Sequence, residues 1–245
     1  MTTPKRLIAA GLATFIAGIA VTFPARIAYN WLAPPGLRLS GISGTVWNGA
    51  AAEGSASGLY LRDIRWHVLP KALFRGRLAY SIESDTSFGS IRSDVGVTIG
   101  GAVVLNRLDS VFSLQAFGDQ FQLQGFDGTL NVRFDTLVVR NGFPTDAVGT
   151  VRLSNLMARQ ISPDVIGDYQ AEFTSGPNGV TGNVEDLGGV LDVAGSISLS
   201  NDRSYAFTGT VAALPGAPRG LTDQLRLLGS ADAQGRREFR IEGQL

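Results

Sequence analysis

One long apolar run dominates the hydropathy pattern of the chain, because no charged residue occurs between Arg6 and Arg26. As an α-helix, the 19 residues from Leu7 to Ala25 extend for about 28 Å at 1.5 Å per residue. This length is close to the hydrocarbon thickness of a bilayer. The pattern therefore predicts a single transmembrane anchor over residues 7–29.

The flanks of this run predict its orientation. Lys5 and Arg6 precede it and no comparable group of cations follows at once, which favours a cytoplasmic N-terminus. Tyr29 and Trp31 suit the aromatic belt at the opposite interface. A cleavable signal peptide is the alternative, and it too would export the rest of the chain. The expected division is a cytoplasmic tail at 1–6, the anchor at 7–29 and a periplasmic β-rich domain at 30–245.

Beyond the anchor, apolar and polar residues alternate in many short segments, which is typical of β-strands. The expected strands cover residues 37–46, 49–69, 78–82, 90–99, 111–117, 120–123, 129–134, 136–140, 149–153, 169–174, 179–184, 190–199 and 205–212, with a last strand around Phe239 and Ile241. The alternation slips at Thr136, which predicts a β-bulge there. Phe239 and Ile241 are expected on the apolar face.

Glycine accounts for 31 of the 245 residues and often opens these segments, as at Gly128-Thr129, where it supplies the positive φ of turns and bulges. Helix signals are few: one turn at Pro70–Arg75 and an N-cap at Thr222. We therefore predict a mainly β protein, in which a Gly-rich, strongly twisted antiparallel sheet, open or partly closed like a barrel, follows the N-terminal helix. A division into two lobes near Asn141–Asp146 is an open alternative.

Two tryptophans mark the most distinctive part of the sequence. Trp47 lies in a Gly-Thr-Val-Trp-Asn-Gly segment, and Trp66 follows on an alternating segment. There the period of two places Tyr60 and Ile64 on the same face as Trp66, and His67 on the other, polar face. We expect both indoles to anchor a core between two paired strands, which is a structural role.

Composition argues against most chemical functions. The chain has 21 basic and 21 acidic residues, only two lysines, one histidine and no cysteine. This disfavours nucleic acid as a partner and leaves no thiolate nucleophile or Cys-ligated metal. His67 with Asp63 is the only local candidate for a general base, and its place on a polar strand face explains it equally well. We expect no enzyme, no cofactor and no metal.

Several segments resemble, in their order and spacing, the N protein of the bacterial type II secretion system. They are GTVWNG (44–49), IRWHVLP (64–70), LFRGRL (73–78), a Gly-Gly-x-Leu segment (188–191) and the closing LGSADAQGRREFRIEGQL (228–245). The positions that match the family pattern are Gly44, Thr45, Trp47, Gly49, Trp66, Pro70, Gly76, Gly188 and Gly189. The family brings no catalytic residues to carry over, so these positions are expected to be structural.

The resemblance implies a non-enzymatic inner-membrane subunit that supports the export of folded proteins across the outer membrane. Its implied partners are the membrane, through the N-terminal helix, and other secretion subunits in the inner membrane and periplasm. A groove-like envelope protein that binds or transfers lipids between membranes is the alternative, since an anchored β-sheet with an apolar concave face suits that task as well.

Overall fold

The computed structural model describes residues 4–33, 36–56, 59–73, 78–86, 89–98, 100–117, 125–161 and 164–244. The chain forms two compact units, Met1–Ser87 and Phe88–Leu245. The boundary considered near Asn141–Asp146 falls inside the second unit. Asn141 and Gly142, with φ of 51° and 80°, form the tight turn of a β-hairpin there.

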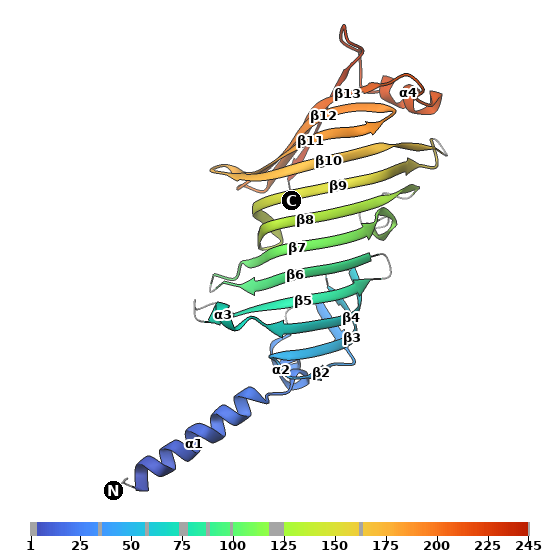
Figure 1. Ribbon diagram of the computed structural model, residues 1–245. Helices are drawn as coiled ribbons and strands as arrows, with labels where there is room; N and C mark the ends of the chain where they lie inside the picture. The colour runs from blue at the N-terminus through green and yellow to red at the C-terminus, as the bar shows by residue number, and fades with distance from the viewer. Residues whose placement is uncertain are drawn as a thin grey trace. The chain divides into compact units, whose positions relative to one another are not determined.

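Most of the described residues lie in β-strands, so the mainly β prediction with few short helices is confirmed (Figure 1). The helices are α1 (Pro4–Val21), α2 (Ala25–Leu32), α3 (Pro70–Leu73) and α4 (Arg219–Arg226), with a 3-10 turn η1 (Leu114–Phe117). The strands of the first unit are β1 (Leu37–Ser40), β2 (Ser43–Gly44), β3 (Asn48–Ala56), β4 (Leu59–Val68) and β5 (Leu78–Thr86). Those of the second unit are β6 (Gly89–Val97), β7 (Val103–Ser113), β8 (Phe126–Arg140), β9 (Phe143–Ala158), β10 (Val165–Gly176), β11 (Gly179–Gly189), β12 (Leu191–Ser200), β13 (Ser204–Ala213) and β14 (Arg237–Gln244).

The segment expected to form the anchor contains two helices rather than one. α1 ends at Val21 and α2 begins at Ala25, with Pro24 at its N-cap. Proline has no amide hydrogen to donate and disfavours a helical conformation of the residue before it, so the helix breaks here. In the part of the chain that the structure describes, we find no helix whose length and apolar character together suffice for a membrane span.

The first unit is a sheet in which β1, β3, β4 and β5 are neighbours in that order, with β2 paired to the start of β3. The alternation expected for β4 is interrupted, because Asp63 adopts a φ of 48° and the β4–β5 register shifts beside it. Such a bulge changes which face the next residues occupy. Leu61 therefore shares the apolar side with Ile64, and Tyr60, which was expected on that side, is 44% exposed.

In the second unit, the order of the strands in the sheet is their order in the chain, from β6 to β14, and the pairs from β6–β7 to β13–β14 are all antiparallel. β14 does not pair with β6, so this sheet is open rather than closed like a barrel. The bulge expected at Thr136 is confirmed by a register shift between Phe134 and Thr136. The strand expected at 111–117 is partly wrong, since β7 begins at Val103 and η1 replaces its end. The strand expected at 120–123 lies outside the described residues.

One face of this sheet is apolar. The cross-strand register places Phe134 of β8 and Phe173 of β10 on the two sides of Gly149 of β9, and the two rings lie 5.7 Å apart. On β13 and β14 the rings of Phe207 and Phe239 meet edge to face at 4.8 Å. Packing in this unit therefore consists largely of contacts between neighbouring side chains on one sheet face.

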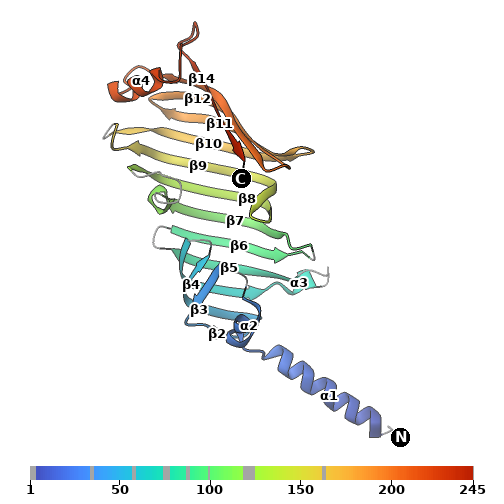
Figure 2. The same cartoon turned by 180° about the vertical axis from the view of Figure 1, so that it is seen from behind.

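α4 lies beside β13, near one end of the strands (Figure 2). Its Leu221 is buried against Ile166. The helix begins at Arg219, directly after Pro218, rather than at the expected cap Thr222, because a proline at the N-cap has no amide that would need a partner. At the C-terminus, Phe239 and Ile241 share one face of β14 as expected, since they lie opposite Gly209 and Phe207 of β13, although Ile241 is 57% exposed.

Tyr169 of β10 carries the one buried side-chain polar atom without a hydrogen-bond partner among the described residues. Its hydroxyl lies beside the apolar cluster that holds Leu221. Burial and the negative charges of Asp186 and Asp168 raise the pKa of Tyr169 to about 12. The ionised form is therefore disfavoured in the folded state.

We expect Tyr169→Phe to leave the free energy of unfolding near neutral pH unchanged or raised by up to about 1 kcal/mol, because it removes an unsatisfied polar group. The pKa of Tyr169 is higher in the folded state than its unfolded value of 10.0. Its contribution to the free energy of unfolding is therefore retained below pH 10.0 and lost as the pH rises towards about 12. The wild-type chain should lose more stability than the variant over that interval. Denaturant titrations at several pH values measure both effects, and a clear loss at neutral pH would show that the hydroxyl has a stabilising partner.

Candidate functional site

The Gly44–Gly49 segment forms a tight turn between β2 and β3, so the strand expected over 37–46 ends at Gly44. Thr45 closes the turn: its backbone N–H donates to the Asn48 carbonyl at 2.9 Å, and its Oγ1 accepts the Asn48 N–H at 3.1 Å. Side-chain bonds of this kind replace the hydrogen bonds that a strand ladder would supply. The turn therefore fixes the direction in which the chain enters β3.

Close contacts require both glycines of this turn. Gly44 has a φ of 80°, and a Cβ there would lie 2.6 Å from the Asn48 carbonyl oxygen. Gly49 pairs with Trp66 across β3 and β4, and a Cβ would lie 2.5 Å from the indole ring and 2.7 Å from the Ser43 carbonyl oxygen. The missing side chain at Gly49 makes room for the Trp66 ring, so one contact accounts for two of the family-pattern positions.

Trp47 connects the turn to the N-terminal helices. Its Nε1 donates to the carbonyl oxygen of Ala20, in the last turn of α1, at 2.7 Å. The neighbouring Val46 N–H donates to the Phe23 carbonyl at 3.0 Å. Because carbonyl groups in the last turn of a helix lack intrahelical partners, these bonds satisfy groups that would otherwise need water. We call this set of contacts, from Ala20 to Trp66, the helix–sheet junction.

α2 lies against the free edge of β1. The Tyr29 hydroxyl accepts the Leu39 N–H at 3.0 Å and donates to the Leu37 carbonyl at 3.3 Å. β1 pairs with β3 on its other side, so this hydroxyl satisfies backbone groups that an edge strand otherwise leaves open. Tyr29 is therefore a half-buried structural residue, whereas Trp31 is 73% exposed.

An apolar pocket of about 380 Å³ lies between α2 and the sheet of the first unit. α2 contributes the small side chains Ala25 and Ala28, and β4 contributes Ile64 and Trp66. The Trp66 Nε1 donates to the Thr45 carbonyl at 3.3 Å, which fixes the ring in the pocket wall. The volume lies within the range of small-molecule sites, roughly 300–1,000 Å³. Since most of its wall is carbon, the pocket suits an apolar group.

The remaining family-pattern positions are structural as well. Pro70 is the first residue of α3, a position where its missing N–H costs no helical hydrogen bond. Gly188 and Gly189, with φ of 133° and 144°, end β11 at a bulge in its pairing with β10. A Cβ at Gly189 would lie 2.5 Å from the Cα of Gly167. Gly76 lies outside the described residues.

Several charged groups in the second unit have partners. Asp127 is buried, forms an ion pair with Arg159 and accepts a hydrogen bond from Gln115. A hollow of about 320 Å³ beside β7 and β8 includes Arg133 and Asp109, whose 3.7 Å ion pair is largely exposed and contributes little. Among the described residues there is no group of three or more Asp, Glu, His or Cys side chains placed to hold a metal ion.

The fold and the junction define a class of protein, in which an open antiparallel sheet is joined to an apolar N-terminal helix by a turn that contains tryptophan. The family model of type II secretion system (T2SS) protein N matches residues 35–240. The chain therefore belongs to the T2SS protein N family, which confirms the resemblance seen in the motifs.

Two curated proteins are similar over almost the whole chain. Type II secretion system protein N of Vibrio cholerae serotype O1 is 28% identical over 259 residues, which cover 98% of this chain and 100% of that protein. Type II secretion system protein N of Aeromonas hydrophila is 27% identical over 270 residues, covering 98% and 99%. No solved structure matches the chain. The chain is thus a component of the type II secretion machinery of the cell envelope.

Sequence reasoning identified one side of the junction only. Trp47, Trp66 and the turn glycines were singled out, and the structure brings them together. Their partners in the N-terminal segment were missed, because Ala20 takes part through its backbone carbonyl, which no side chain reveals. Tyr29 carried a usable signal, since its hydroxyl needs a partner once its ring is half-buried.

We expect Trp47→Phe to lower the free energy of unfolding of the full chain in detergent by about 1 kcal/mol, because the ring remains and the bond to Ala20 is lost. Trp31→Phe is the matched control, since its exposed indole should contribute less than about 0.5 kcal/mol. Denaturant unfolding followed by circular dichroism measures both. Equal losses in the two variants would contradict the role given to the Trp47 Nε1 bond.

Proposed function

We propose that this chain is a non-enzymatic subunit of the type II secretion machinery, attached to the inner membrane with its β-rich region, residues 30–245, in the periplasm. It supports the export of folded proteins across the outer membrane through contacts with other secretion subunits. The helix–sheet junction is the observation that carries this proposal. Trp47, Trp66 and Gly49 join the N-terminal helices to the sheet, which suits a positioned binding module.

The side chains of α1 support attachment through residues 7–29. Ile8 and Phe15 are 71% and 66% exposed, and other large apolar side chains of the helix are exposed on its remaining turns. Apolar surface of this kind is unfavourable in water and favourable in lipid. Lys5 and Arg6 favour a cytoplasmic position for that end, according to the positive-inside rule.

Deleting the gene should lower the amount of secreted type II substrates in the medium and leave them in the periplasm, and the full chain should restore secretion. Replacing residues 1–19 with a cleavable signal peptide should fail to restore it, because membrane attachment is lost while Ala20 and Phe23 of the helix–sheet junction remain. An unrelated single-span anchor of the same orientation is the matched control and should restore secretion. Immunoblots of medium and periplasm measure the outcome, and normal secretion by the deletion strain would contradict the proposal.

Lipid binding is a second candidate function, favoured by the apolar pocket under α2. Ala28 lies in its wall, and the pocket has the carbon-rich lining that an acyl chain requires. If the chain binds lipid, phospholipid should co-purify with the full chain under mild conditions and be detected by mass spectrometry. Ala28→Phe should reduce the lipid bound by filling the pocket, whereas Ile27→Phe, on an exposed position of α2, should not. Purification without phospholipid would dismiss this function.

A further inference from the structure

β14 is the last strand of the sheet in the second unit, and its outer edge is unpaired. It pairs with β13 from Arg237 to Gln244 without a bulge. None of the described residues pairs with its other side. Every second residue of such an edge points its N–H and C=O groups away from the sheet. β1 offers a contrast in the first unit, because the Tyr29 hydroxyl covers the free edge there.

The edge of β14 carries charged side chains but lacks the other features that usually prevent pairing with another chain. Edge strands are commonly interrupted by bulges, prolines or lysines, or are covered by another element. β14 has a continuous register with β13 and contains no proline and no lysine. Ile241, near its middle, is 57% exposed. A regular, uncovered edge with an exposed apolar residue is a template for another strand.

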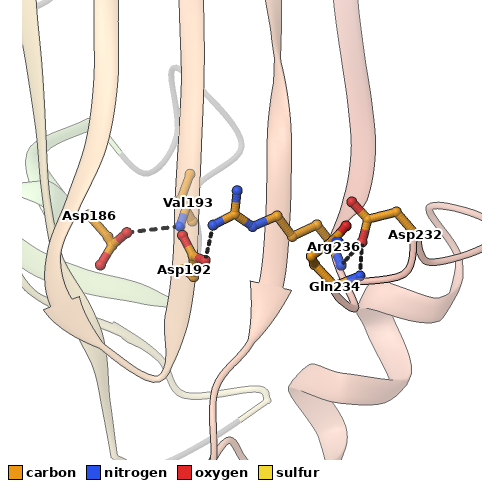
Figure 3. A network of polar contacts seen from close by, with 6 residues as sticks. All are labelled: Asp186, Asp192, Val193, Asp232, Gln234 and Arg236. Carbon is orange, nitrogen blue, oxygen red and sulfur yellow. Dashed lines mark hydrogen bonds and ion pairs between the residues drawn. The ribbon is translucent and has the colours of Figure 1, made fainter.

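The start of β14 is held in a fixed position (Figure 3). The Arg236 Nη2 donates to Asp192 Oδ2 of β12 at 2.9 Å, so the residue that precedes β14 is tied across β13. Asp232 Oδ1 accepts the backbone N–H groups of Gln234 and Arg236 at 2.9 and 2.8 Å, which shapes the turn that leads into the strand. A strand held in this way loses little conformational entropy when it pairs with a partner.

We propose that β14 pairs antiparallel with β14 of a second copy of this chain, with Ile241 on the two-fold axis. In this register Arg240 faces Glu242 of the second copy, and the symmetry repeats this pair. Both side chains are exposed, by 70% and 59%, and are available for the contact although they already pair within one strand at 2.7 Å. The self-complementary charges favour a second copy over an unrelated partner.

In the same register, the side chains on the apolar face of β14 also complement those of the second copy. Ile241 faces its own copy, so an exposed apolar side chain becomes covered. Phe239 faces Gly243 of the second copy, so its ring lies next to the Tyr205 ring that already covers this glycine. The two apolar sheet faces then continue on one side of the joined sheet.

Other registers fit less well. A shift by one residue would place the apolar face of one copy beside the polar face of the other. A two-fold axis at Arg240 or at Glu242 would set like charges opposite each other, which destabilises a strand pair. An axis at Phe239 has compatible charges but pairs only residues 237–241, whereas the axis at Ile241 pairs residues 238–244. The charge pattern and the strand length therefore select the same register.

The test uses the full chain in its membrane, where the absence of cysteine allows a single engineered thiol. In the proposed register, the Cβ atoms of position 241 in two copies lie roughly 4.5–5.5 Å apart. This separation is close to disulfide range. We expect the Ile241→Cys chain to form a disulfide-linked dimer on mild oxidation, seen on a non-reducing gel. Glu238→Cys is the matched control on the same strand, since its two copies would lie about 20 Å apart and should not link.

Charge reversal tests the register itself in the Ile241→Cys chain. Arg240→Glu and Glu242→Arg should each lower the yield of linked dimer at least about fivefold, because each sets like charges opposite each other twice. The double variant restores opposite charges and should restore the yield, which also separates lost pairing from lost folding. Three outcomes would each overturn the proposal. The Glu238→Cys chain could link as well as the Ile241→Cys chain. The Ile241→Cys chain could stay monomeric or link only to other proteins, or the double variant could fail to restore the yield.

Discussion

Backbone hydrogen bonding between strands that follow each other in the chain is the constraint on which the second unit depends. Its sheet has few fully buried side chains, so hydrophobic burial alone does not set the strand order. Each backbone hydrogen bond contributes only about 0.5–1.5 kcal/mol net, but leaving one unmade is costly. Short hairpin turns such as Asn141-Gly142 make pairing with the next strand the arrangement with the smallest loss of chain entropy.

Glycine allows close contacts in the sheets of both units. At Gly49 the missing side chain admits the Trp66 ring, and at Gly189 it lets β11 approach β10 at a bulge. Both contacts are too close for a Cβ atom, so they restrict those positions for reasons of space rather than chemistry. A family pattern rich in glycine and tryptophan can therefore describe a scaffold, and it need not describe a reactive site.

The sequence predicts the alternation of apolar and polar residues along a strand more readily than the contacts that each residue makes. The slip at Thr136 was visible because apolar residues are regular on both sides of it, and the bulge is there. The bulge at Asp63 was hidden, since an apolar residue occurs at either parity along β4. β7 was placed too late, because the apolar residues at its start do not alternate with polar ones, as at Val103 and Val104. The partner of Trp47 is a backbone carbonyl and leaves no mark in the sequence.

The edge strands β1 and β14 differ in how far their backbone groups are satisfied within the chain. At β1 the Tyr29 hydroxyl satisfies two backbone groups of the edge from within the chain, which leaves fewer groups for a partner strand to bind. At β14 the edge is regular, its start is tied to Asp192, and its charges complement their own copy. A single pair of strands is a small interface, so it would be weak between freely diffusing molecules. The proposed attachment to one bilayer would raise the effective concentration of the two copies, and a small self-complementary edge would then suffice for association.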